Sequence, residues 1–115
     1  MTAHTPGPWE AVGSLVRTMP HANNRGGMSG GYLIAEAPVV NEGRYADARL
    51  ISAAPELLDA ARVALEWIES HMRARGYPED VVVWLERNPE AGSPDAIYRQ
   101  RDAVRAAIAK AEGRI

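Results

Sequence analysis

The chain has 115 residues, 46% of them hydrophobic, and its 15 acidic and 13 basic side chains leave a formal net charge of −2. This length is typical of one domain, and the hydrophobic fraction argues against disorder. The absence of cysteine excludes disulfides, thiolate metal sites and a cysteine nucleophile. No basic stripe is present, which argues against binding along a nucleic-acid backbone. No segment resembles a membrane span or a secretory leader, so we expect a cytoplasmic protein without membrane attachment.

The first part of the chain, residues 1–44, is rich in glycine and proline and predicts a small antiparallel sheet. The expected order is a strand at 9–18, a loop at 19–31 and a strand at 32–37. The pair Gly13-Ser14 interrupts the first strand with either a bulge or a turn. Two strands alone make a marginal sheet. A third strand near 39–40 is one solution, although Pro38 weakens it.

The remainder, residues 45–115, predicts three to four helices. We expect them at 45–54, 55–75, 78–87 and 93–112. Pro55 should bend the chain between the first two, and Gly76 should end the second. The apolar run at 81–85 has strand propensity, but the acidic residues after Pro78 favour a helix there. The last helix is expected to begin with Ser93 as N-cap, Pro94 in its first position and Asp95 in its first turn.

The longest expected helix carries two apolar stripes. One contains Leu58, Ala61, Leu65, Ile68 and Met72, and the other contains Leu57, Ala60, Ala64 and Trp67. Together they predict a wide buried face, with Trp67 and Trp84 as packing residues. The long helices at 55–75 and 93–112 are expected to form an antiparallel pair. The fold class is therefore α+β: a single domain in which a small N-terminal hairpin or sheet packs on a helical bundle.

Few residues suggest chemistry. His4 lies next to a proline-stiffened turn and either contacts a ligand or fixes the turn by bonding a carbonyl. Thr5 either contacts a ligand or caps that turn. Trp9 either stacks on a planar ligand or seals the core, and the core role is favoured.

Two further residues complete the candidate ligand site. Asp47 is expected to face inward, where its carboxylate bonds the N-terminal turn or His4, or contacts a ligand. Arg25, in the glycine-rich loop, presents a guanidinium to an anion or lies at an exposed tip. The three histidines lack the spacing of a metal site, so neither a metal nor a cofactor is expected.

Two motifs carry a family resemblance: His-Thr-Pro-Gly-Pro-Trp at 4–9, and Ala-Arg-Leu-Ile-Ser-Ala-Ala-Pro-Glu-Leu-Leu at 48–58. In this order they resemble a family of small bacteriophage and prophage proteins of unassigned function. The resemblance covers about residues 4–65, and the chain after Arg75 is expected to be an individual extension. Such proteins often have Asn at the position of Asp47, which implies a hydrogen-bonding role. The resemblance implies a phage accessory protein acting in the cytoplasm of the bacterial host.

Three functional hypotheses follow. The first is a non-catalytic counter-defence protein, in which a homo-oligomer sequesters a cyclic nucleotide or an ADP-ribose-type signal through the five candidate residues. The alanine-rich core without phenylalanine favours the oligomer. The second is an adaptor that docks on a host or phage protein through a helical face. The third is a small hydrolase using His4 and Asp47 as acid and base. All three expect the opening segment to fold onto the helical bend at Pro55, with any cleft along that seam.

Overall fold

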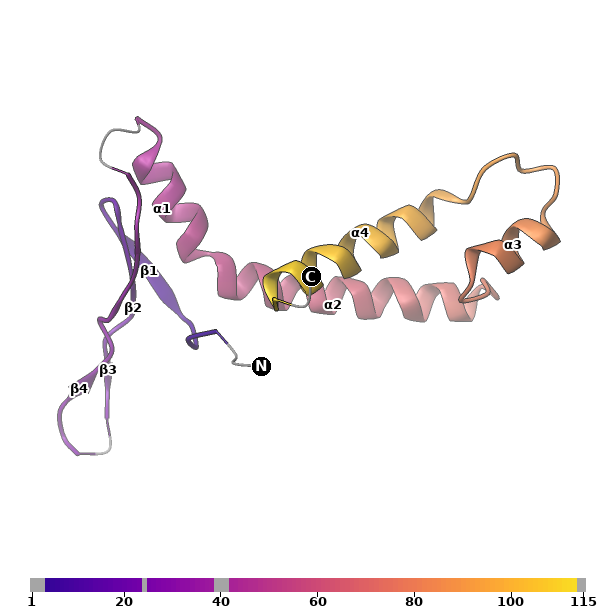
Figure 1. The fold of residues 1–115 in the computed structure, drawn as a ribbon. Helices are drawn as coiled ribbons and strands as arrows, with labels where there is room; N and C mark the ends of the chain where they lie inside the picture. Colours follow the sequence, from indigo (N-terminus) through magenta and orange to yellow (C-terminus); the bar gives the residue numbers. More distant parts are fainter. Residues whose placement is uncertain (1–3, 24, 39–41, 114–115) are drawn as a thin grey trace. The chain divides into compact units, whose positions relative to one another are not determined.

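The structure is a computed structural model that describes residues 4–23, 25–38 and 42–113 (Figure 1). Antiparallel strands come first and helices follow, which confirms the α+β class. The chain divides into two compact units, Met1–Leu58 and Asp59–Ile115. Whether the two units form a single domain stays a prediction.

The first unit contains an antiparallel sheet with the order β1-β2-β5. Its strands are β1 (Trp9–Val12), β2 (Leu15–Thr18) and β5 (Leu33–Glu36). The single strand expected at 9–18 is therefore two strands, and the pair Gly13-Ser14 is the turn of a hairpin. Gly13 has φ +63°, a conformation that glycine adopts without steric cost. The hairpin supplies the missing third strand, and the candidate strand at 39–40 lies outside the described residues.

The segment expected to be a loop contains a second, smaller hairpin. Its strands are β3 (His21–Ala22) and β4 (Met28–Ser29). The Oδ1 of Asn23 accepts hydrogen bonds from the backbone N–H groups of Arg25 and Gly27, both at 3.0 Å. This side chain supplies the bonds of a tight turn, which is why two short strands pair where composition alone predicts a loop.

Helix α1 (Arg44–Ser52) packs on the sheet, chiefly on β1 and β2. Val16, Ala37 and Ala48 form the buried centre of this unit, and Trp9 and Ile51 pack against it. The small side chain of Ala48 lets the helix approach the sheet closely. The expected core role of Trp9 is confirmed.

Helix α2 (Ala54–Ala74) follows α1 after a single turn residue, Ala53. Pro55 occupies the first turn of α2, where a missing N–H costs no helical hydrogen bond. The predicted break is confirmed, and it lies at Ala53, because Pro55 has no N–H to donate to the carbonyl of Ile51 and its ring crowds the preceding turn.

The second unit completes the helical set with α3 (Val81–Arg87) and α4 (Ala96–Ala111). The run at 81–85 is helical because Asp80 caps α3, accepting a hydrogen bond from the N–H of Val82 at 2.8 Å. The expected N-cap of α4 is wrong: Asp95, not Ser93, accepts from the N–H of Ile97 at 3.0 Å.

Helices α2 and α4 lie side by side and antiparallel, as expected (Figure 1). Arg62 near the start of α2 pairs with Glu112 just after α4, and Glu69 farther along α2 pairs with Arg105. The expectation of a wide buried face on α2 is wrong. Met72 is buried, but Trp67 is 66% exposed, because α4 covers only one of the two apolar stripes.

Candidate functional site

The opening segment packs on the helical bend within the first unit. A Cβ placed on Gly7 would lie 2.8 Å from Cβ and 3.1 Å from Cγ of Pro55, so these two residues are in direct contact. The indole Nε1 of Trp9 donates to the carbonyl of Pro6 at 3.3 Å. The expected seam between the opening segment and the bend is therefore present.

His4 and Trp9 lie together at this seam. Their rings meet edge to face, with centroids 6.1 Å apart and an interplanar angle of 88°. The Nδ1 of His4 is 2.8 Å from the carbonyl oxygen of Thr5, so the histidine ring bonds a carbonyl of its own turn. These contacts favour a structural role for His4.

The other two predicted residues lie on different elements. Arg25 is exposed in the turn between β3 and β4. Asp47 is half-buried in the first turn of α1. The neighbouring Tyr45 lies near Gly13, at the end of β1 opposite to His4. This arrangement does not favour an acid–base pair of His4 and Asp47, and the ligand role of the five residues stays a prediction.

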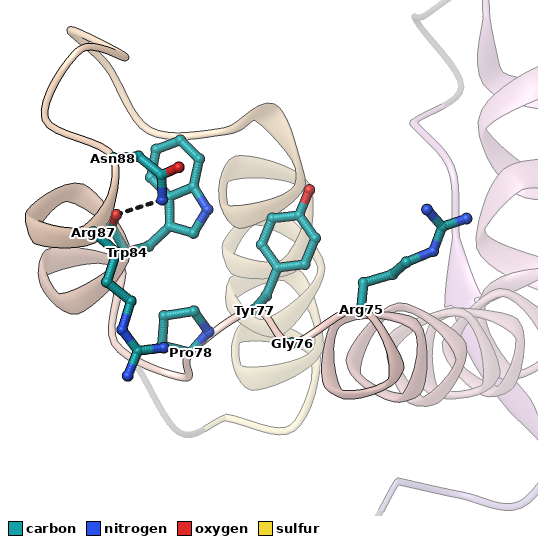
Figure 2. A pocket seen from close by; sticks show the side chains of 7 residues that line it. All are labelled: Arg75, Gly76, Tyr77, Pro78, Trp84, Arg87 and Asn88. Atoms are coloured by element: carbon teal, nitrogen blue, oxygen red, sulfur yellow. Dashed lines mark hydrogen bonds between the residues drawn. The ribbon is translucent and has the colours of Figure 1, made fainter.

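A pocket of about 260 Å³ lies in the second unit, beyond the end of α2 (Figure 2). Its lining residues come from the turn after α2 and from α3 and its C-cap: Arg75, Gly76, Tyr77, Pro78, Trp84, Arg87 and Asn88. None of the five residues predicted from the sequence lines it. The lining includes two arginines and two aromatic residues; in Figure 2 the Arg75 side chain extends away from Tyr77, and the Arg87 guanidinium lies beside Pro78.

The turn that forms one wall of this pocket begins where α2 ends. Gly76 has φ +76°, and the N–H of Tyr77 donates back to the carbonyl of Met72 at 2.9 Å. A glycine in this conformation followed by such a bond is a common helix C-cap. The expected end of the helix at Gly76 is confirmed, and the cap sets the direction in which Tyr77 leaves the helix.

Buried aromatic packing holds the pocket walls in place. Tyr98 of α4 is only 2% exposed, and its hydroxyl donates to the carbonyl of Pro78 at 2.6 Å. Its ring meets those of Tyr77 and Trp84 at 5.9 and 6.1 Å between centroids. Edge-to-face contacts of this kind stabilise a fixed geometry. The two aromatic walls of the pocket are therefore supported from behind by α4.

Polar contacts fix the remaining groups. Asn88, the C-cap of α3, donates from Nδ2 to the carbonyl of Trp84 at 2.8 Å (Figure 2). The hydroxyl of Tyr77 donates to Asp95 at 3.1 Å, and this hydrogen bond is the main cause that raises the pKa of Tyr77. The tyrosine therefore stays protonated and neutral at physiological pH.

The two arginines give the pocket its charge. Within residues 4–23, 25–38 and 42–113, neither Arg75 nor Arg87 forms an ion pair with a carboxylate. Figure 2 shows them on opposite sides of Tyr77 and Pro78. A guanidinium offers several N–H donors in a planar fork that suits phosphate and carboxylate. Each arginine can therefore bind an anion at an edge of the pocket.

A neighbouring hollow differs in charge. The pocket beside the start of α4 is lined by two carboxylates, Asp95 and Asp102, and one guanidinium, Arg99, so it suits an anion less well. Among the described residues no group of three or more His, Asp or Glu side chains could hold a metal ion. No helix among them has the length and apolarity needed to cross a membrane.

Sequence reasoning missed the pocket residues. Trp84 was interpreted as a packing residue, and Gly76 only as the end of a helix. The available signal was the density of arginine and aromatic residues between two helix ends, from Arg75 to Asn88. That signal is weak on its own, because the contacts of Tyr98 that complete the pocket come from a distant part of the chain.

Comparison with known proteins places the chain in a phage family. No curated protein and no solved structure matches it. The family described as Salmonella phage P22 protein Y8K6 matches residues 1–115. Because the match includes everything after Arg75, the expectation that this part is an individual extension is wrong. The chain belongs to the family of Salmonella phage P22 protein Y8K6.

Proposed function

We propose that this phage protein binds a nucleotide-derived anion and sequesters it without converting it. The observation that carries the proposal is the pocket of about 260 Å³ in which Arg75 and Arg87 accompany the rings of Tyr77 and Trp84. Guanidinium groups bind phosphate through charge-assisted hydrogen bonds, and indole and phenol rings stack on a planar base. A nucleotide combines both features in one molecule.

The size of the pocket narrows the ligand class. Ligand sites commonly enclose roughly 300–1,000 Å³, and this pocket of about 260 Å³ lies just below that range. It suits one base or one phosphorylated ribose. A cyclic mononucleotide, or the adenosine part of an ADP-ribose-type compound, fits this description better than a complete dinucleotide.

The lining argues for binding rather than turnover. It contains arginine, aromatic, glycine, proline and asparagine residues, and it includes no carboxylate, histidine, serine or lysine. Acid–base catalysis at neutral pH needs a group that exchanges a proton near pH 7. The raised pKa of Tyr77 moves its phenol farther from that range. In a phage protein, binding without turnover suits the removal of a nucleotide signal used in host defence.

The test is ligand binding by calorimetry and thermal shift. The panel comprises 3′,5′-cyclic AMP, 3′,5′-cyclic GMP, ADP-ribose, AMP and a cyclic dinucleotide. At a ligand concentration 100 times Kd, binding should stabilise the folded state by about 2.7 kcal/mol. The double variant Arg75→Ala/Arg87→Ala should weaken binding at least about tenfold, because each lost charge-assisted contact contributes roughly 1.5–3 kcal/mol. Arg49→Ala, which removes an exposed arginine of α1, is the matched control.

Two further measurements decide the location and the fate of the ligand. His4→Ala tests a competing site at the opening segment and Arg25→Ala one at the β3–β4 turn, and a loss of binding confined to either variant would move the site there. Mass spectrometry of the denatured complex should recover the intact ligand. Binding by no member of the panel, or appearance of a hydrolysed product, would overturn the proposal.

A further inference from the structure

Arg101 on α4 is a buried charged side chain that does not itself line the pocket. It is 5% exposed, and no other charged residue is buried in the part of the chain that the structure describes. Its Nη1 donates to the backbone carbonyl of Glu79 at 2.9 Å, and its Nε donates to the carboxylate of Asp102 at 3.0 Å. The centre of the guanidinium also lies 5.1 Å from the centroid of the Tyr98 ring. A buried charge is costly unless it is paired and hydrogen-bonded, and these contacts meet both conditions.

The carbonyl that Arg101 holds directly follows the pocket wall formed by Tyr77 and Pro78. The carbonyl of Pro78 accepts a hydrogen bond from the hydroxyl of Tyr98 at 2.6 Å. The hydroxyl of Tyr77 donates to Asp95, the N-cap of α4, at 3.1 Å. Three side chains of α4 and its N-cap, each three positions after the last, therefore hold three consecutive residues of this turn.

Glu79 is also the junction between the two walls of the pocket. The next residue, Asp80, is the N-cap of α3, and α3 carries Trp84 and Arg87 into the lining. We infer that Arg101 is a positioning residue of the pocket: by holding the Glu79 carbonyl, it fixes the separation between the turn and α3. The inference rests on the proposed function, because it concerns ligand affinity at the same site. A preorganised pocket loses less entropy when a ligand binds, so this contact should raise the affinity.

A second arginine of α4 reaches Glu79, but only at its side chain. The Nη2 of Arg105 lies 2.9 Å from the Glu79 carboxylate, whose side chain is 77% exposed. Exposed ion pairs contribute little, because water screens them and two long side chains must be ordered. A hydrogen bond from a buried guanidinium to a backbone carbonyl is screened much less. Arg101 rather than Arg105 therefore sets the position of the backbone at this junction.

Amide hydrogen exchange of the purified full chain without ligand tests the positioning. The N–H of Tyr77 closes the C-cap of α2 at 2.9 Å, and the N–H of Val82 donates to the N-cap of α3 at 2.8 Å. Exchange of these two amides therefore reports both sides of the junction. Arg101→Met removes the guanidinium donors and keeps an unbranched side chain against Tyr98, and it should speed both exchange rates at least about tenfold. Arg99→Met, the same substitution at an exposed position of α4, is the matched control and should leave both rates unchanged.

Calorimetry with ADP-ribose and 3′,5′-cyclic AMP tests the consequence for binding. Arg101→Met should weaken the affinity at least about tenfold, and Arg99→Met should leave it unchanged. Arg101→Lys should recover part of the affinity, because an ammonium can still donate to the Glu79 carbonyl but lacks the planar fork that also reaches Asp102. Ile108→Val shortens a buried side chain of α4 that does not line this pocket, so it should lower stability without lowering affinity. Circular dichroism checks that each variant is folded at the temperature of the titration.

The outcomes separate this inference from the proposed function. Unchanged exchange or unchanged affinity in Arg101→Met would overturn the inference. An equal loss of affinity in Ile108→Val would also overturn it, because general destabilisation would then explain the loss. If Arg101→Met does not fold, Arg101→Lys decides, and exchange and affinity equal to those of the natural chain would overturn the inference. If the natural chain binds no member of the nucleotide panel, the proposed function fails, and the exchange rates alone then decide whether Arg101 fixes the turn.

Discussion

The contact between Gly7 and Pro55 predicts that Gly7→Ala destabilises the first unit. The new Cβ would lie 2.8 Å from Cβ of Pro55, whereas carbon atoms pack at roughly 3.5–4.0 Å. The opening segment would have to move by about 1 Å, and Trp9, which packs against the core of this unit, is close to the displaced backbone. Overpacking of this kind costs about 2 kcal/mol.

Urea and thermal unfolding of the purified chain measure this cost. A loss of about 2 kcal/mol corresponds to a decrease in Tm of roughly 10 °C for a unit of this size. Gly27→Ala is the control, because its Cβ would meet only the Asn23 side chain at an ordinary 3.7 Å. In a Pro55→Gly background, Gly7→Ala should cost less than it does in the natural chain. Equal stabilities of Gly7→Ala and Gly27→Ala would refute the packing of the opening segment on the bend.

Two more predictions concern the second unit. Asp95→Ala should lower the free energy of unfolding in urea by about 2 kcal/mol, because one carboxylate oxygen caps α4 and the other accepts a hydrogen bond from the hydroxyl of Tyr77. A decrease below about 0.5 kcal/mol, roughly the effect of a neutral surface substitution, would contradict both roles. The hydrogen bond from Arg105 is the main cause that lowers the pKa of Glu79, so the folded state favours the ionised carboxylate. The stability that the Glu79–Arg105 pair contributes is fully present above the unfolded-state pKa of Glu79, and it is lost as the pH falls through the lower folded-state pKa. Glu79→Gln should therefore unfold more easily than the natural chain at pH 7. The loss of stability should be under about 1 kcal/mol, because the Glu79–Arg105 pair is exposed, and it should disappear at low pH. A loss of stability that does not change with pH would show that the charge of Glu79 is not the cause.

Two helix boundaries, the break near Pro55 and the end of α2, could be predicted because local chemistry decides them. Pro55 lacks the N–H that would bond the carbonyl of Ile51, which places the break between α1 and α2 just before it. Gly76 adopts a left-handed conformation that other residues rarely reach, which ends α2. Each of these constraints acts within one helical turn. The sequence therefore contains all the information that they need.

Choices between equivalent local solutions needed the tertiary structure. Ser93 and Asp95 both satisfy the N-cap rules, and the contact of Asp95 with Tyr77 distinguishes them. The pair Gly13-Ser14 suits a bulge or a turn, and pairing of the strands on either side of it shows a turn. In the first case the deciding residue, Tyr77, is distant in sequence from Asp95, and in the second the decision depends on pairing between two strands.

The candidate site depended even more on long-range packing. The amphipathic spacing of α2 identified both apolar stripes, but it could not show that α4 covers one stripe and leaves Trp67 exposed. The pocket exists because Tyr98 from α4 packs behind Tyr77 and Trp84. By itself the sequence determined that strands precede helices, that the helical part breaks near Pro55 and that α2 ends at Gly76, since these follow from backbone sterics and periodicity. Only the tertiary structure decided which faces are covered and which side chains share a cavity, because those outcomes depend on where distant helices meet.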